Sequence, residues 1–189
     1  MQEFPCRPTG VLACPVRSQD APPRARLDHA AARVGARAAA PAAAVVAAGA
    51  THAVRRAASI DAFEKHDLQL IWQTGKPYAD IAKQVTGIRK NVWTNDFITH
   101  MENAFAAADI VVSRAGAMAI AELCVVKKPV IFVPYPFAAE DHQTKNAQHL
   151  VKKEAGLMIK DAEASDKLIP ALIGLAENQE QQHRLRYNI

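Results

Sequence analysis

The sequence of 189 residues is poor in cysteine and has no long apolar run. Its three cysteines are Cys6, Cys14 and Cys124. They are odd in number and lack the C-x-x-C spacing of zinc and redox sites, so neither a disulfide framework nor a metal site is indicated. We expect Cys124 to be a small buried residue and the compartment to be reducing. Because Arg, Pro or Gly interrupts every apolar stretch before about 18 residues, the sequence predicts no transmembrane helix.

Lysine and aromatic residues are scarce in the first part of the chain. Residues 1–59 contain eight Arg, no Lys and three acidic residues, a net charge of +5, and their only aromatic residue is Phe4. Residues 60–189 contain eleven Lys, four Arg and sixteen acidic residues, a net charge of −1. The overall charge of +4 therefore comes from the first segment, and it does not indicate a nucleic-acid partner for the rest.

The composition of this first segment also differs from that of the rest. Residues 1–59 contain nineteen Ala and six Pro, a composition that buries little surface, so we expect them to be irregular or disordered. The abrupt exchange of Arg for Lys near residue 60 indicates two joined coding regimes. Our first interpretation is that residues 1–59 are not native enzyme sequence but a shifted reading frame or a mis-joined gene. The second is an organelle transit peptide, which is also rich in Arg and poor in acids.

From residue 60 onward, short apolar runs alternate with helical patterns. We predict strands at 68–72, 92–93, 109–112, 129–133 and 157–159, and helices at 78–85, 100–108, 117–126, 141–153 and 165–176. This alternation predicts an α/β fold, in which helices flank a Rossmann-like parallel sheet. The loops at the carboxyl ends of such strands form the ligand site.

One of these loops has the pattern of an anion site. The stretch IVVSRAGAMAIAE runs from a strand through Gly116 into a helix, whose first N–H groups belong to Ala117, Met118 and Ala119. A phosphate placed there meets the positive end of the helix dipole. Glu122 follows about 7.5 Å along the axis, a distance suited to a ribose beside a diphosphate. The alternative is an ordinary strand–helix joint with a solvated Glu.

The same stretch resembles the donor-binding motif of the MurG glycosyltransferases, and the likeness extends in register from Asn95 to Gly156. Enzymes of this family transfer N-acetylglucosamine from UDP to a lipid-linked muramyl pentapeptide in peptidoglycan synthesis. The resemblance implies that residues 60–189 are an incomplete UDP-sugar donor domain, one half of a GT-B architecture. It also implies an inverting transfer that needs no metal and no cofactor.

The resemblance further implies contacts for particular residues. The backbone beside Phe97 and Ile98 is expected to bind the uracil edge, and Gln143 and Asn146 are expected to contact the sugar. The alternatives are core packing for the first pair and surface amides for the second. Arg114 either approaches a phosphate or braces its loop. Gly75 and Lys76 either face the site or form a turn.

Several parts of a MurG-like enzyme are not found in the sequence, which stops inside a predicted helix. The family's N-terminal domain carries the acceptor site and is expected to supply the catalytic base, so the catalytic residue is unknown and this chain alone is expected to be inactive. Binding of the lipid acceptor and peripheral association with the cytoplasmic face of the bacterial inner membrane are expected of the full-length enzyme only.

Two other functions stay open. One is a non-catalytic α/β remnant, and the other is a different UDP-sugar enzyme of this architecture, such as a 2-epimerase or a diacylglycerol glycosyltransferase. The string DHQTKNA favours the MurG family.

Overall fold

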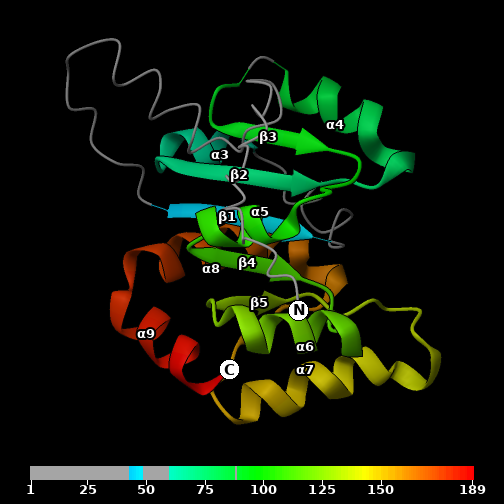
Figure 1. Cartoon of the computed structure of the whole chain (residues 1–189), viewed down its shortest axis with the longest axis vertical. Helices are drawn as coiled ribbons and strands as arrows, with labels where there is room; N and C mark the ends of the chain where they lie inside the picture. Colours follow the sequence, from blue (N-terminus) through cyan, green and yellow to red (C-terminus); the bar gives the residue numbers. More distant parts are fainter. Residues whose placement is uncertain (1–42, 49–59, 88) are drawn as a thin grey trace, which may run out of the picture.

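The computed structural model describes residues 43–48, 60–87 and 89–189. Six parallel strands form one sheet in the order β3-β2-β1-β4-β5-β6 (Figure 1). The strands are β1 (Ala43–Ala48), β2 (Leu68–Gln73), β3 (Val92–Asn95), β4 (Ile110–Ser113), β5 (Val130–Phe132) and β6 (Leu157–Met158). The α-helices are α3 (Ile60–Lys65), α4 (Ala79–Thr86), α5 (Met101–Ala107), α6 (Ala117–Val126), α7 (His142–Lys152), α8 (Ala164–Glu177) and α9 (Gln179–Asn188). Three short 3-10 helices, η1 (Lys76–Tyr78), η2 (Ala139–Asp141) and η3 (Asp161–Glu163), precede α4, α7 and α8.

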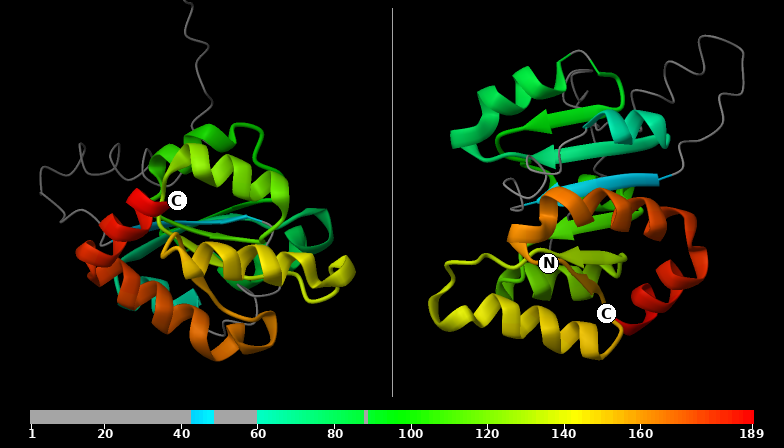
Figure 2. Two further views of the ribbon diagram at one scale, coloured as in Figure 1. Left: turned by 90° about the horizontal axis from the view of Figure 1, so that it is seen from below. Right: turned by 180° about the vertical axis from the view of Figure 1, so that it is seen from behind.

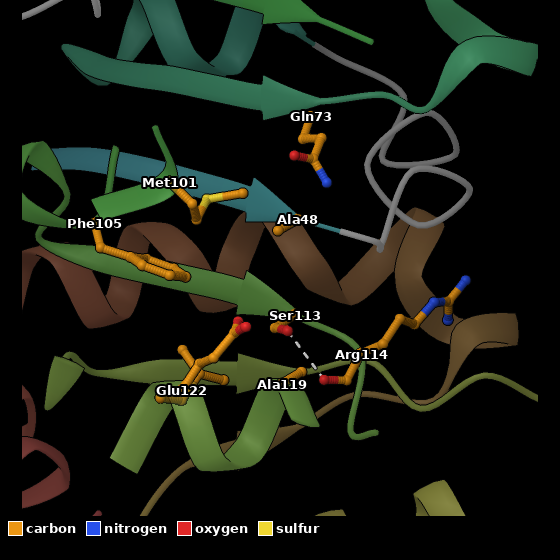
Figure 3. A pocket seen from close by; sticks show the side chains of 9 residues that line it. Ala48, Gln73, Met101, Phe105, Ser113, Arg114, Ala119 and Glu122 are labelled. Carbon is orange, nitrogen blue, oxygen red and sulfur yellow. Dashed lines mark hydrogen bonds between the residues drawn. The ribbon is translucent and has the colours of Figure 1, made fainter. Parts of the chain in front are cut away.

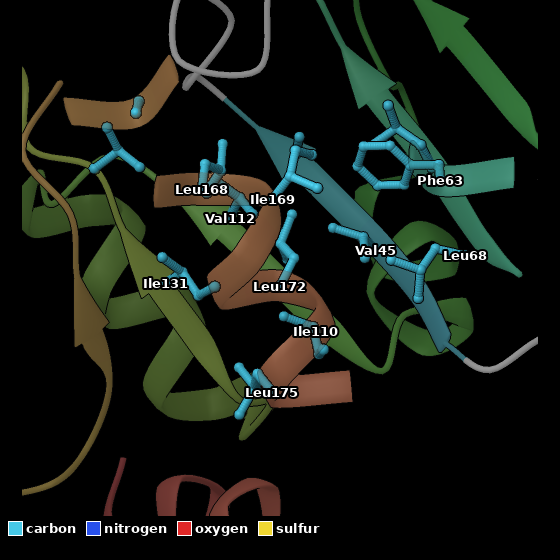
Figure 4. Close-up of a cluster of buried hydrophobic side chains, with 14 of the residues drawn as sticks. Val45, Phe63, Leu68, Ile110, Val112, Ile131, Leu168, Ile169, Leu172 and Leu175 are labelled. Atoms are coloured by element: carbon cyan, nitrogen blue, oxygen red, sulfur yellow. The ribbon is translucent and has the colours of Figure 1, made fainter. Parts of the chain in front are cut away.

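Helices cover both faces of the sheet. The central strands are therefore apolar at successive residues and do not alternate between apolar and polar side chains. Every residue of β4 and β5 is buried. Ile110 and Val112 face α8 and pack with its Leu168 and Leu172 (Figure 4). Val111, which points to the opposite face, packs in a second cluster. That cluster includes Phe105 of α5, Leu123 of α6 and Ala147 of α7. Figure 2 shows the two helical layers on either side of the sheet.

The central strand β1 corrects our expectation for residues 1–59. We expected this whole segment to be irregular, but residues 43–48 pair in parallel register with β2 on one side and β4 on the other. The side chains of Val45 and Ala47 are completely buried or nearly so. Pairing along both edges overrides the weak strand propensity of an Ala-rich run. Residues 1–42 and 49–59 lie outside the described residues, and both interpretations of their origin stay predictions.

The strands and helices predicted from residue 60 onward are confirmed, with ends that shift by one or two residues. The short helix α3 was not predicted, whereas α9 is the helix in which we expected the sequence to stop. The parallel, helix-flanked sheet is likewise confirmed. In the part of the chain that the structure describes, no helix has both the length and the apolar character needed to cross a membrane.

The strand order determines where a ligand site can form. The chain moves outward from β1 through β2 to β3, and then returns to the other side of β1 to place β4, β5 and β6. The strand that follows β1 therefore lies on one side of the pair β1 and β4, and the strand that follows β4 lies on the other. Such a reversal leaves a crevice between the two strand ends, and this crevice is where ligands of open α/β sheets bind.

A close contact at the start of β6 gives a test of this packing. A Cβ at Gly156 would lie 2.6 Å from Cε2 of the fully buried Phe132, so we expect Gly156→Ala to lower the free energy of unfolding by about 1–3 kcal/mol. Gly174→Ala in α8 is the matched control. No heavy atom lies within 4 Å of its Cβ position, and we expect a gain of about 0.5–1 kcal/mol. Urea denaturation of both variants measures the difference, and equal midpoints would contradict the packing described.

Candidate functional site

A pocket lies at the carboxyl ends of β1, β2 and β4, between α5 and α6 (Figure 3). Its residues come from five elements and from the turn after β4: Ala48, Gln73, Met101, Phe105, Ser113, Arg114, Ala119, Glu122 and Leu123. The pocket occupies the crevice between β1 and β4 that the strand order predicts. Its polar groups stand beside apolar walls from α5 and α6, an arrangement typical of small-molecule sites.

The head of α6 reaches this pocket through Ala119, whereas the predicted site residues Gly116, Ala117 and Met118 are not among the residues that line it. The helix begins at Ala117, as the sequence predicted, and Gly116 is its N-cap in an extended conformation with no side-chain cap. The first bond that closes the helix runs from the N–H of Ile120 to the carbonyl of Gly116 at 3.0 Å. The N–H groups of Ala117, Met118 and Ala119 therefore precede the helical ladder. They form an end that favours an anion.

Glu122 lies on the same side of α6 as Ala119, three residues earlier, and both residues line the pocket. In Figure 3 the Glu122 carboxylate points toward Ser113 and the strand ends. The side chain is exposed. A carboxylate in this position can accept hydrogen bonds from two neighbouring hydroxyl groups of a ligand.

Gln143 and Asn146 reach the same turn from the start of α7. The Gln143 Oε1 atom accepts from the N–H of Ala115 at 3.3 Å and from the N–H of Tyr135 at 3.0 Å. The Asn146 Nδ2 group donates to the carbonyl of Ala115 at 3.1 Å. The i, i+3 spacing thus puts both amides on one face, as expected. They are fastened to backbone and do not line the pocket itself, and their contact with a sugar stays a prediction.

Arg114 braces its loop, which is one of the two alternatives that we left open. Its Nη1 atom donates to the carbonyls of Val133 and Pro134 at 3.0 Å each and to Oδ1 of Asp161 at 2.6 Å. Its guanidinium carbon lies 5.4 Å from the centre of the Tyr135 ring. In Figure 3 the guanidinium points away from Glu122. An approach to a phosphate by this side chain stays a prediction.

Phe97 and Ile98 differ in their environments. Ile98 packs in the core, whereas Phe97 is 63% exposed, so core packing is wrong for Phe97. The N–H of Ile98 donates to Oε1 of Gln73 at 3.0 Å, and that of Phe97 donates to Oδ1 of Asp96 at 2.9 Å. The structure therefore links this loop to the pocket through Gln73. The binding of a uracil edge by this loop stays a prediction.

A family model for the glycosyltransferase family 28 C-terminal domain matches residues 44–187. The chain belongs to this family. The matched range includes nearly all of β1 and therefore begins upstream of the boundary that we drew at residue 60.

Curated relatives of this family 28 domain are similar to about two thirds of the chain. Two of them, both named UDP-N-acetylglucosamine--N-acetylmuramyl-(pentapeptide) pyrophosphoryl-undecaprenol N-acetylglucosamine transferase, come from Parabacteroides distasonis and Bacteroides fragilis. The first is 48% identical over 132 residues, which are 69% of this chain and 36% of the relative. The second is 50% identical over 126 residues, which are 65% of this chain and 33% of the relative. The chain thus spans about a third of the length of these relatives.

Solved structures show the same fold. MurG of Acinetobacter baumannii superposes with a TM-score of 0.64 at 22% identity, covering 76% of this chain and 46% of that one. The S. aureus MnaA–UDP complex superposes with a TM-score of 0.55 at 12% identity, covering 77% and 40%. These structures confirm the Rossmann-like half of a GT-B architecture that the sequence resemblance implied.

Sequence reasoning missed several pocket residues of this family 28 domain. Gln73 is two residues from Ile71 on the same face of β2, and this period could have placed it beside the predicted Gly75 turn. Met101 and Phe105 share one face of α5 and could have been found from their i, i+4 spacing. Lys76 is exposed in η1 and does not line the pocket, which favours the turn that we gave as its alternative.

Cys124 and Glu102 lie on the helices α6 and α5 that flank the pocket. Cys124 is exposed on α6, so its predicted burial is wrong, because α6 is apolar on its outer face as well as its inner one. A backbone hydrogen bond at the start of α5 lowers the pKa of the Glu102 carboxyl, and the neighbouring His100 side chain lowers this pKa further. Within the described ranges, no three His, Cys, Asp or Glu side chains gather where they could hold a metal ion.

The pairing of Arg114 with Asp161 can be measured by a double-mutant cycle. The two side chains are 13% and 9% exposed, so removing one partner leaves a buried charge. We expect Asp161→Ala to lower the free energy of unfolding by about 3 kcal/mol and the coupling with Arg114→Met to be about 1–3 kcal/mol. The exposed Glu163–Lys167 pair of the same region is the control, with an expected coupling of about 0.3–0.5 kcal/mol. Equal couplings in the two cycles would contradict the bracing role.

Proposed function

We propose that this chain is the donor-binding half of a UDP-N-acetylglucosamine-dependent transferase of peptidoglycan synthesis. In this proposal the full-length protein moves N-acetylglucosamine from UDP to a lipid-linked muramyl pentapeptide, the reaction that the names of its curated relatives describe. The chain spans about a third of those relatives. We therefore propose, for the full-length protein, the lipid-linked acceptor, the transfer itself and a place at the cytoplasmic face of the bacterial inner membrane.

One observation carries the proposal: the Glu122 carboxylate and the head of α6 meet the same pocket at the end of β4. A diphosphate accepts hydrogen bonds from the N–H groups of Ala117, Met118 and Ala119, and the helix dipole favours its charge. The ribose that follows the diphosphate brings two hydroxyl groups to Glu122. The base then lies against Met101 and Phe105, which form the apolar wall of the pocket from α5.

The chemistry of transfer follows from where negative charge develops. The oxygen of the acceptor hydroxyl attacks the anomeric carbon from the face opposite UDP, the bond from that carbon to the diphosphate oxygen breaks, and UDP leaves. A base takes the hydroxyl proton, and we assign no described residue to this role. The head of α6 stabilises the charge that grows on the departing diphosphate, a role that a divalent cation fills in other enzymes.

Calorimetry with UDP tests the site. We expect the wild-type chain to bind UDP and Glu122→Ala to weaken binding by about tenfold to a hundredfold, because hydrogen bonds to a charged group contribute about 1.5–3 kcal/mol. Glu177→Ala, which removes an exposed carboxylate at the end of α8, is the matched control and should leave the affinity unchanged. No heat at millimolar UDP would favour a non-catalytic module, and equal affinities of the two variants would exclude Glu122 from the site.

A further inference from the structure

Two aromatic side chains are exposed on the loop that joins β5 to η2. Tyr135 is 42% exposed and Phe137 is 82% exposed. Their ring centres lie 5.8 Å apart at an interplanar angle of 73°, an edge-to-face contact. The pair therefore presents a joined apolar surface, and clusters of this kind on a surface commonly mark a binding site.

The base of this loop is held firmly. Gln143 accepts from the backbone N–H of Tyr135 at 3.0 Å, and Arg114 donates to the two carbonyls that immediately precede Tyr135. The Arg114 guanidinium also lies against the Tyr135 ring. The carbonyl of Tyr135 accepts from the N–H of Ala138 at 3.2 Å, so a turn encloses Phe137. Tyr135 is thus a fixed support, and Phe137 extends from it toward solvent.

The same contacts place the aromatic pair beside the head of α6. The Gln143 Oε1 atom that binds Tyr135 also accepts from Ala115, two residues before the helix begins. The Nε2 atom of Gln143 lies 3.9 Å from the Cβ position of Gly116. The Tyr135 ring lies beside the Arg114 guanidinium. In Figure 3 this guanidinium points away from Glu122, so Tyr135 and Glu122 lie on different sides of the turn before α6. With its ribose at Glu122 and its diphosphate at the helix head, a ligand of the proposed kind extends toward the side of the turn where Tyr135 lies, and the Phe137 ring is in edge-to-face contact with Tyr135.

We propose that Phe137, supported by Tyr135, packs against the C–H face of the donor's sugar ring. This inference rests on the proposed function and names the sugar subsite of the same pocket. A hexose in its chair form has a face of C–H groups, which an aromatic face of negative electrostatic potential attracts. The hydroxyl groups at the ring's edge need hydrogen-bonding partners, and the Gln143 amide beside Gly116 supplies a donor on that side.

Comparing UDP with UDP-N-acetylglucosamine isolates this contact, because only the second ligand carries the sugar. Calorimetry on the full 189-residue chain should show that Phe137→Ala loses roughly three- to tenfold in affinity for UDP-N-acetylglucosamine and keeps its affinity for UDP. Phe137→Trp retains an aromatic face and should restore most of the loss. Tyr187→Ala is the matched control, since this aromatic residue is 84% exposed on α9, which lies by the amino ends of the strands, away from the loop after β5 (Figure 1).

A second measurement does not depend on affinity. In saturation-transfer NMR with millimolar UDP-N-acetylglucosamine, irradiation of aromatic protons should reach the ring protons of the sugar, and Phe137→Ala should weaken this transfer while Tyr187→Ala does not. Equal losses for both ligands, or no loss for either, would overturn the sugar subsite. UDP binding that still depends on Glu122 would then leave the proposed function standing. A wild-type chain that binds neither ligand would refute both proposals.

Discussion

Ala115 is held at both of its backbone groups, and the geometry of the site depends on this constraint. Its N–H donates to Gln143 and its carbonyl accepts from Asn146, so one helix turn of α7 fastens the residue that links β4 to α6. Ala115 is completely buried, which leaves these amides as the partners that its backbone needs. The head of α6 can then point at the crevice without a capping side chain, because the bonds at Ala115, the residue before the N-cap Gly116, fix the direction of the helix.

A second constraint joins the loops on the far side of the same turn. Through its Nη1 atom, Arg114 donates to two carbonyls after β5 and to a carboxylate before α8, so one side chain links three groups. The pairing of a buried cation with a buried anion is weak support for net stability, but loss of one partner is strongly unfavourable. The pair therefore fixes the relative position of three loops more than it stabilises the fold. This rigidity is what allows Tyr135 to serve as a support for its neighbour.

The sequence predicted those parts of the site in which the local sequence pattern favours the same conformation that the folded structure adopts. Gly116 followed by an apolar helical run gave the start of α6 correctly, and the spacing from that start to Glu122 placed the carboxylate at the pocket. Strand β1 was missed because its sequence, AAVVAA, has little strand propensity of its own, and only pairing with β2 and β4 selects its conformation. The amides of Gln143 and Asn146 were correctly grouped on one face. Their bonds to Ala115 could not be foreseen. These bonds join α7 to the turn after β4, and the sequence alone does not say how close these two segments lie in the fold.

The net charge of residues 60–189 explains why an anionic ligand has to be attracted by groups within the site rather than by the domain as a whole. Residues 60–189 carry a net charge of −1, so the domain as a whole offers no attraction to a nucleoside diphosphate. Attraction arises from uncapped N–H groups at the head of α6, whose partial charges act within a turn of the helix. The Glu122 carboxylate lines the same pocket, and it is tolerable there because, in the proposed complex, it faces hydroxyl groups rather than phosphate oxygens. In the proposed complex the acid lies to one side of the helix head and the aromatic pair to the other, an order that suits a ligand whose negative charge lies in its middle.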